Sequence, residues 1–302
     1  MAWLDVLKSV LYGIVEGITE WLPISSTGHL LILERLVPFR AGGDAISNQR
    51  FFSFFLVVIQ LGAVLAVVVT FWQQLWPFRQ RRLDGDLTGS GQVSGKNSLS
   101  LWIDHKILRL WIMILIACVP AAIIGVLFDE KIEAIFYNSW TVAVMLIVVG
   151  LAFLVIELYI RWKRRQPSIQ STEQIDWKAA LLIGLFQLIA AILPGTSRSG
   201  ATILGGLLIG MSRPVAATFT FFLAVPVMAG ASLLKVMRIG LDFNLVQWLS
   251  IFAGMGVAYL VSVLTIRFLL DFVRRHDFRI FAFYRILLGG ILIAATLTGL
   301  LR

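Results

Sequence analysis

The sequence predicts an all-α protein that lies in a membrane, and two observations carry that prediction. Hydrophobic residues make up 59% of the chain and charged residues only 14%, whereas a soluble domain usually contains about 25% charged residues. The apolar residues also form long runs without period-two alternation, which is typical of helices rather than of barrel strands. We therefore expect residues 1–302 to form a single integral membrane domain.

Six apolar runs are long enough to cross a bilayer, which takes roughly 17–25 helical residues. They predict about six transmembrane helices, at 51–72, 107–127, 141–160, 215–237, 247–270 and 281–301. Polar links separate these runs, and the longest link includes a Gly-, Ser- and Asp-rich stretch at 83–100 that we expect to be a solvated loop.

Two further apolar regions, at 3–36 and 179–212, are interrupted by polar, Ser-rich motifs. Pro23 in the first region and Pro194 in the second break the helical hydrogen bonding, and each half is too short to cross a membrane comfortably. The sequence therefore predicts two re-entrant helix–loop–helix segments in addition to the six spans.

Basic residues indicate how the spans are oriented. They cluster in or beside the links at 79–109, 161–165 and 274–279, and they are sparse near 128–140 and 238–246. The positive-inside rule then places the first three links in the cytoplasm. It places the loops near 128–140 and 238–246, and both chain ends, on the outer side. The net charge of +9 follows this pattern, so it indicates topology and anionic lipid, and no nucleic-acid partner is expected.

An internal repeat relates the two halves of the chain, roughly 1–127 and 179–301. Gly13 aligns with Gly184, the pair Leu22-Pro23 with Leu193-Pro194, and Ser26 with Ser197. A second block aligns Phe54-Phe55-Leu56 with Phe221-Phe222-Leu223. Because the predicted orientations of the halves are opposite, this is an inverted repeat, which tends to place a ligand site near the membrane midplane.

The second polar motif, 187–202, contains the residue types that bind an anion. Arg198 supplies a planar fork of donors that suits phosphate oxygens. Glycines that allow close backbone approach and hydroxyls that can donate surround it, namely Gly195, Ser197, Ser199, Gly200 and Thr202. The motif lacks the Lys of a nucleotide-binding loop. The alternative is a helix cap with an Arg that reaches the membrane surface.

The first polar motif, 16–29, contains acid, base and nucleophile candidates. Glu16 and Glu20 lie four residues apart on one helix face, where they could hold a divalent cation or one could stay protonated. His29 could act as acid, base or nucleophile. Ser25 and Ser26 could attack a phosphate if His29 or a Glu takes the proton, and the Thr27 hydroxyl could contact the phosphate. Taken singly, each could instead be a packing partner or a helix cap.

Together the two motifs resemble those of a known enzyme family. The run Glu16-Gly-x-Thr-Glu20-x-Leu-Pro-x-Ser-Ser-Thr-Gly-His29, with Pro194-Gly-x-Ser-Arg198-Ser-Gly-Ala-Thr202, is similar to the BacA-type undecaprenyl-diphosphate phosphatases over nearly the whole chain. The resemblance implies a bacterial inner-membrane hydrolase that converts undecaprenyl diphosphate to undecaprenyl phosphate, the lipid carrier for peptidoglycan and other cell-wall glycans. It also implies bacitracin resistance and dependence on magnesium or calcium.

By the same resemblance, Glu16, Glu20, Ser26, His29 and Arg198 match the functional positions of the family. We expect the polyprenyl diphosphate to enter from the periplasmic side and Arg198 to hold its phosphates. Ser26 then attacks with His29 as its base, or His29 attacks directly. A polyprenyl-phosphate flippase is the alternative function, because broken helices in inverted repeats are typical of transporters. The sequence leaves the formation of a homodimer open.

Overall fold

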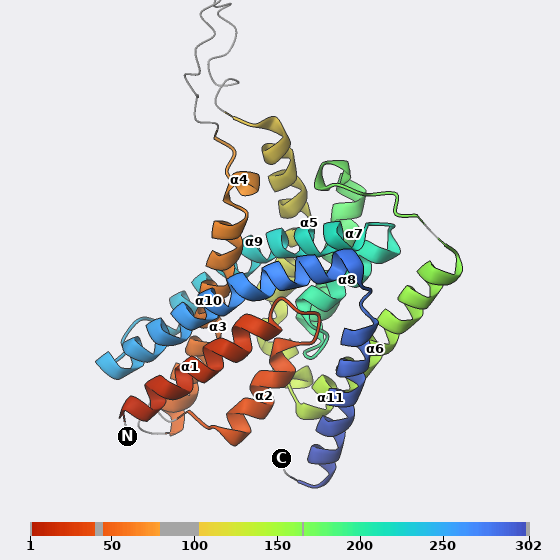
Figure 1. Ribbon diagram of the computed structural model, residues 1–302. Coiled ribbons are helices and arrows are strands. Elements are labelled where there is room, and N and C mark those ends of the chain that lie inside the picture. The colour runs from red at the N-terminus through yellow and green to blue at the C-terminus, as the bar shows by residue number, and fades with distance from the viewer. Residues whose placement is uncertain (1, 40–44, 79–102, 165, 300–302) are drawn as a thin grey trace, which may run out of the picture.

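The computed structural model describes residues 2–39, 45–78, 103–164 and 166–299 (Figure 1). The described chain is built from helices, and β-structure within it is limited to isolated bridges. The predicted loop at 83–100 lies outside the described residues. The elements are α1 (Ala2–Thr19), α2 (Ser26–Leu36), α3 (Ala45–Thr70), α4 (Trp72–Leu75), α5 (His105–Phe136), α6 (Ser139–Trp162), the short 3-10 turn η1 (Thr172–Gln174), α7 (Trp177–Ile192), α8 (Arg198–Leu208), α9 (Arg213–Ile239), α10 (Leu245–Arg275) and α11 (Arg279–Leu297).

The six predicted spans are confirmed as helices. Six described helices contain segments long and apolar enough to cross a membrane, and these belong to α3, α5, α6, α9, α10 and α11. Large apolar side chains face outward along them, such as Leu65, Leu151 and Leu264. Exposed leucines of this kind are expected where a protein surface meets lipid tails rather than water.

Both predicted breaks are also confirmed. The first apolar region divides into α1 and α2 around Pro23, and the second divides into α7 and α8 around Pro194. Proline interrupts the helix because it has no backbone N–H to donate and its ring clashes with the preceding turn. The position of these two helix pairs in a membrane, and hence their re-entrant character, stays a prediction.

One predicted link is wrong. The sequence predicts an outer loop near 128–140, but α5 continues as far as Phe136. Residues 126–136 contain neither Gly nor Pro, so nothing stops the helix where its apolar run ends. The connection to α6 is only Tyr137 and Asn138, and the side chain of Asn138 caps α6 by accepting from the Thr141 N–H at 2.9 Å.

Helices of the first half of the chain pack against helices of the second half. Extensive contacts between the halves join α1 to α10, α3 to α10 and α5 to α7. Outside this set, α6 packs extensively against α11. A Cβ added at Gly13 would lie 2.4 Å from the Gly254 oxygen on α10, and one added at Gly184 would lie 2.5 Å from the Ala117 oxygen on α5. The aligned glycines thus permit equivalent close crossings, as in membrane helix pairs packed through small residues. The opposite orientation of the halves in a membrane stays a prediction.

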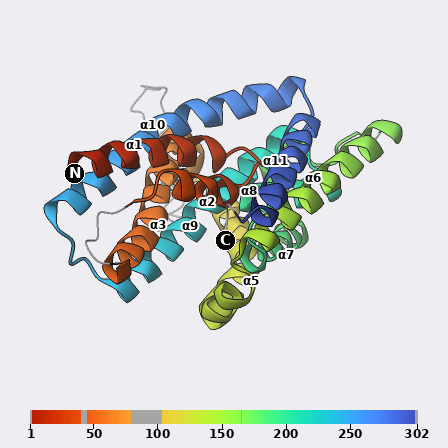
Figure 2. The same ribbon diagram turned by 90° about the horizontal axis from the view of Figure 1, so that it is seen from below.

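The arrangement places α8 at the centre of the molecule. Residues Ser199–Leu207 of this helix are all buried, and Figure 2 shows α8 surrounded by longer helices. Figure 1 places the start of α1 and the end of α11 at one end of the molecule and α4 at the opposite end. The side of the membrane on which the two chain ends lie stays a prediction.

Candidate active site between the two proline-led loops

The loop between α1 and α2 and the loop between α7 and α8 end in the same backbone conformation. We call residues 20–25 the first loop and residues 193–197 the second loop. Their last residues, Ser25 and Ser197, have φ of 74° and 67°, a region that residues other than glycine rarely adopt. Each serine caps the helix that follows by accepting an N–H three residues on, from Gly28 at 3.4 Å and Gly200 at 3.2 Å. Ser25 and Ser197 therefore occupy equivalent positions.

This equivalence corrects the alignment read from the sequence. The sequence pairs Ser26 with Ser197, but the caps pair Ser26 with Arg198, because each is the first residue of its helix. The second loop has one more residue between its proline and its cap. Gly195 helps to accommodate it with φ of 88°, and a Cβ at that position would lie 2.5 Å from the Val142 oxygen.

The two equivalent residues meet on one carboxylate. The Ser26 hydroxyl donates to Glu20 Oε2 at 2.7 Å, and Arg198 Nη2 donates to Glu20 Oε1 at 2.8 Å. The Arg198 and Glu20 side chains are only 12% and 7% exposed, so their attraction is screened little by solvent. A hydroxyl, its proton acceptor and a cation are thus held in contact between the loops.

His29 lies beside this group but binds elsewhere. Its Nδ1 is 2.7 Å from the Ser25 oxygen, and its Nε2 is 2.6 Å from the Tyr284 hydroxyl. A carbonyl oxygen can only accept, so Nδ1 carries a proton, and in the neutral ring Nε2 then accepts from Tyr284. The sequence predicts His29 as the base for Ser26, but the residue that accepts the Ser26 hydrogen bond is Glu20. The sequence does not predict a role for Tyr284, because a single tyrosine in an apolar span is not part of any recognisable motif.

Several buried polar atoms near the loops have no partner in the described part of the chain. They include both carboxylate oxygens of Glu16, which is fully buried, and Nε of Arg198. The same 171-residue shift that aligns Gly13 with Gly184 aligns Glu16 with Gln187. The Gln187 amide is also buried and has no partner in the described part of the chain. An unpaired buried polar group costs about 1–3 kcal/mol, and a charged one more, so this cluster is suited to a polar ligand.

The hydroxyls of the second motif contact protein groups. Ser199 Oγ donates to the Leu22 oxygen at 3.3 Å and lies 3.0 Å from Ser197 Oγ. Thr202 Oγ1 donates to the Arg198 oxygen and lies 2.8 Å from Thr220 Oγ1 of α9. These contacts connect the second motif to the first loop and to α9. The predicted contacts of Ser197, Ser199 and Thr202 with a phosphate stay predictions.

A second arginine lies behind the loops. Arg285 of α11 has no exposed surface, and it donates to the oxygens of Pro23, Gly195 and Thr196 at 3.1, 2.9 and 2.9 Å. Gly195 is predicted from the sequence to allow close backbone approach to a phosphate, and its main-chain oxygen accepts from Arg285. Sequence reasoning missed this residue, although an arginine inside a predicted span is by default a functional candidate.

A cavity of about 460 Å³ adjoins the first motif. Thr27, the residue after Ser26, lines it, and its other walls come from α2, α3, α5, α7 and α9. The lining is mainly apolar, and it includes the charged residues Glu34, Lys235 and Arg238. A pocket of this composition suits a ligand with a hydrocarbon tail and a charged head.

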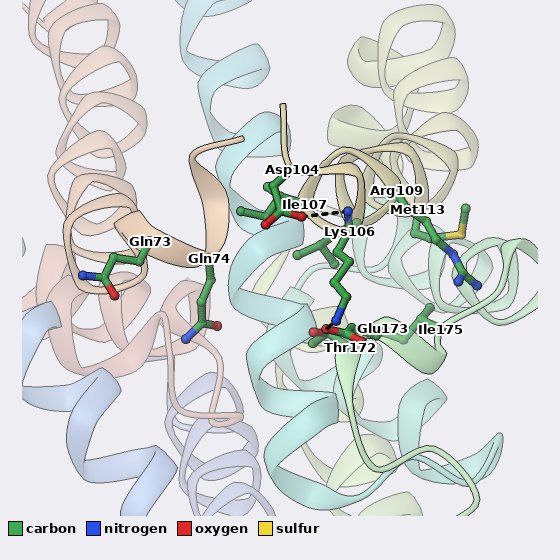
Figure 3. A pocket seen from close by; sticks show the side chains of 11 residues that line it. Gln73, Gln74, Asp104, Lys106, Ile107, Arg109, Met113, Thr172, Glu173 and Ile175 are labelled. Atoms are coloured by element: carbon green, nitrogen blue, oxygen red, sulfur yellow. Dashed lines mark hydrogen bonds and ion pairs between the residues drawn. The ribbon is translucent and has the colours of Figure 1, made fainter. Parts of the chain in front are cut away.

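A larger cavity, of about 520 Å³, lies between α4, the start of α5 and η1 (Figure 3). It shares no lining residue with the two loops. Figure 3 shows Lys106 pointing toward Glu173, and the ion pair between them is 3.1 Å long. Size therefore does not locate the site, because the larger cavity lacks the buried, converging groups that surround Glu20.

The chain was compared with known families and proteins. The model of the family described as bacitracin resistance protein BacA matches residues 9–291. The chain belongs to the BacA family. The undecaprenyl-diphosphatase of Desulfitobacterium hafniense is 46% identical over 293 residues, covering 97% of this chain and 96% of that protein. Undecaprenyl-diphosphatase 1 of Clostridium acetobutylicum is 47% identical over 289 residues, covering 96% of each chain.

The BacA match and these relatives extend over both loops, so the site described above lies within the shared region. A third relative, the undecaprenyl-diphosphatase of Enterococcus faecalis, is 45% identical over 97% of this chain. The BacA membership predicted from the two motifs is therefore confirmed.

Proposed function

We propose that this protein is an undecaprenyl-diphosphatase of the BacA family, which releases the terminal phosphate of undecaprenyl diphosphate and leaves undecaprenyl phosphate. The names of its relatives support the substrate. The observation that carries the chemistry is the contact of Ser26 and Arg198 with the same Glu20 carboxylate, next to a largely apolar cavity. Hydrolysis of a lipid diphosphate needs a nucleophile, a proton acceptor and a cation in that relation.

In the proposed reaction, Ser26 Oγ attacks the terminal phosphorus while its proton passes to Glu20. The bond from phosphorus to the bridging oxygen breaks, and undecaprenyl phosphate leaves with the electron pair. Water then attacks the phosphoserine, which restores the Ser26 hydroxyl and releases inorganic phosphate. Arg198 holds the phosphate oxygens, because phosphoryl transfer depends mainly on positioning and charge stabilisation.

Direct attack by His29 is less favoured by the geometry. The lone pair of Nε2 is directed at the Tyr284 hydroxyl, so attack would require that hydrogen bond to break first. Because phosphohistidine is lost in acid, the test is a rapid quench in denaturant at neutral pH with a prenyl diphosphate labelled at its terminal phosphate. Mapping of the modified peptide then distinguishes the two nucleophiles. We expect label on Ser26, and acid-labile label on His29 would reverse the assignment.

A divalent cation, magnesium or calcium, fits the buried carboxylate of Glu16. Both Glu16 oxygens are unpaired among the described residues, whereas the two oxygens of Glu20 bind Arg198 and Ser26. The described residues contain no cluster of three His, Cys, Asp or Glu side chains, so phosphate oxygens and water would complete the shell. Such an ion would neutralise phosphate charge. Chelation should abolish turnover, and Glu16→Gln should raise the magnesium concentration needed for half-maximal activity.

We propose that the cavity next to Thr27 opens on the periplasmic side. Support comes from the distribution of basic residues and from the placement of both chain ends opposite α4. The test uses a Cys118→Ser background, because Cys118 is the only cysteine. A membrane-impermeant maleimide should label Lys235→Cys in intact spheroplasts and label Gln73→Cys only after permeabilisation. The opposite pattern would invert the topology.

The decisive test of the function is phosphate release by purified protein in detergent. With magnesium and undecaprenyl diphosphate, wild-type protein should release one phosphate per lipid. Vesicles that move polyprenyl phosphate between leaflets without releasing phosphate from the diphosphate would instead indicate the flippase. The names of the relatives favour the phosphatase.

A further inference from the structure

Arg285 is a buried charge that the proposed reaction does not use. Its guanidinium is fully buried in α11, and among the described residues its hydrogen bonds all go to main-chain oxygens. The ion pairs formed within the described chain do not include it. Burying a charge without a counter-charge is costly, so a residue of this kind needs a specific function.

The hydrogen bonds of Arg285 connect three parts of the chain. Nη1 binds the Pro23 oxygen of the first loop, and Nη2 binds the Gly195 and Thr196 oxygens of the second loop. Nε lies 3.4 Å from the Leu146 oxygen of α6. A planar guanidinium can make all of these bonds at once because its donors point in fixed, separate directions. The separation of the two loops is therefore set partly by one side chain.

The same side chain lies directly behind the start of α8. A Cβ added at Gly200 would be 3.2 Å from Arg285 Nη1, and Gly200 is two residues from Arg198. Arg285 thus supports the loop backbone, while Arg198 and Ser26 extend from the helix starts toward Glu20. A shift of one loop relative to the other would separate Ser26 from Arg198.

We propose that Arg285 is a positioning residue that fixes the two loops at the separation at which Ser26, Glu20 and Arg198 meet. The proposal rests on the proposed phosphatase function. A misplacement of about 1 Å can lower a rate roughly a hundredfold without abolishing binding. Loss of the Arg285 bridge should therefore reduce kcat far more than it changes KM.

The first variant is Arg285→Lys, which keeps the charge but has one nitrogen in place of three. We expect kcat to fall about 30- to 100-fold, with KM within about threefold of wild type. Wild-type kcat in Arg285→Lys would show that charge alone suffices and would overturn the proposal. A rise in KM at unchanged kcat would do the same, because it would indicate a role in binding.

A second variant tests the bridge without removing Arg285. Gly200→Ala places a methyl group against Nη1 and should displace the guanidinium by a few tenths of an ångström. Because alanine favours a helix over glycine by about 0.8–1.0 kcal/mol, thermal stability in detergent should hold or rise while kcat falls. Unchanged kcat would contradict the proposal, even if Arg285→Lys does not fold.

The matched control is Gly290→Ala, also on a helix, where an added Cβ has nothing within 4 Å. It should keep wild-type kcat and KM. The double variant Arg285→Lys with Gly200→Ala should be little worse than Arg285→Lys alone, because both changes disturb one bridge. Inactive wild-type protein would count against the phosphatase function, whereas equal activity of wild type and variants would count against the bridge alone.

Discussion

The first and second loops end in the same backbone conformation, but the residues that follow them differ in chemistry. Each ends in a serine with positive φ that caps a helix through a glycine three residues on. The next residue is Ser26 after the first loop and Arg198 after the second, and the two side chains meet on Glu20. Two equivalent helix starts thus bring a hydroxyl and a guanidinium to the same carboxylate.

In the proposed reaction, the helix starts after the two loops have different roles. The backbone sets where a side chain begins, and the residue at that position sets what it does. Glu16 and Gln187 differ in the same way, because both are buried without partners in the described chain but only Glu16 can carry charge. Cation binding is therefore expected in the first copy only.

The largest expected effect comes from truncating the two equivalent residues. Ser26→Ala removes the proposed nucleophile and should lower turnover by at least about 10⁴-fold, with substrate binding largely kept. Arg198→Ala should lower turnover by about 10³-fold or more and should also weaken binding, because it removes the phosphate fork. Phosphate release and equilibrium binding of a labelled prenyl diphosphate measure the two effects separately. Wild-type turnover in Ser26→Ala would refute its assignment.

The next largest effect should come from Glu20→Gln, which keeps the shape of the side chain but removes its charge. An amide cannot take the Ser26 proton, so kcat should fall by roughly 10²- to 10⁴-fold. Glu34→Gln, on α2 and also beside the cavity, is the comparison variant and should keep kcat within about threefold. Equal losses of kcat in the two variants would mean that Glu20 acts only through its negative charge and not as the proton acceptor for Ser26.

A smaller effect is expected from Tyr284→Phe. This change removes the hydroxyl that lies 2.6 Å from His29 Nε2, while the ring is kept. The loss of one hydrogen bond costs about 0.5–1.5 kcal/mol, so kcat should fall by about threefold to tenfold. Tyr159→Phe, at a 46% exposed position of α6, is the control. A rise in activity in Tyr284→Phe would indicate that His29 must be released from Tyr284 to react.

The smallest effect should be on stability and should come from the two caps. Ser25→Ala and Ser197→Ala each remove one cap, worth about 1 kcal/mol. Ser197 also contacts Ser199 and has the shorter cap bond, at 3.2 Å against 3.4 Å. Thermal unfolding in detergent should therefore show a larger loss for Ser197→Ala. The reverse order would argue that the caps are not equivalent.

Several features followed directly from the chain. Long apolar runs predicted the six spans because crossing a bilayer requires about 20 apolar residues. Pro23 and Pro194 predicted the breaks because proline cannot continue the hydrogen bonding of a helix. Glu20, Ser26 and Arg198 were predicted as site residues because charge and hydroxyl groups in apolar segments are costly without a function. All of these signals are local, so one stretch of sequence carries each of them.

Other features depended on contacts between distant residues. The register of the loops was misjudged by one position because a left-handed glycine, Gly195, lengthens the second loop. The end of α5 was misjudged because the apolar run stops before the helix does.

Tertiary structure alone determined which partners each group has. It brought Ser26 to Glu20 rather than to His29, and it directed His29 toward Tyr284. It also placed Arg285 behind loops that are 90 and 262 residues away in sequence. Composition and periodicity set which segments form helices and which residues are chemically able to react. The packing of α11 and α8 against the first loop sets which of those residues touch, because hydrogen bonds between distant segments form only once the helices have packed.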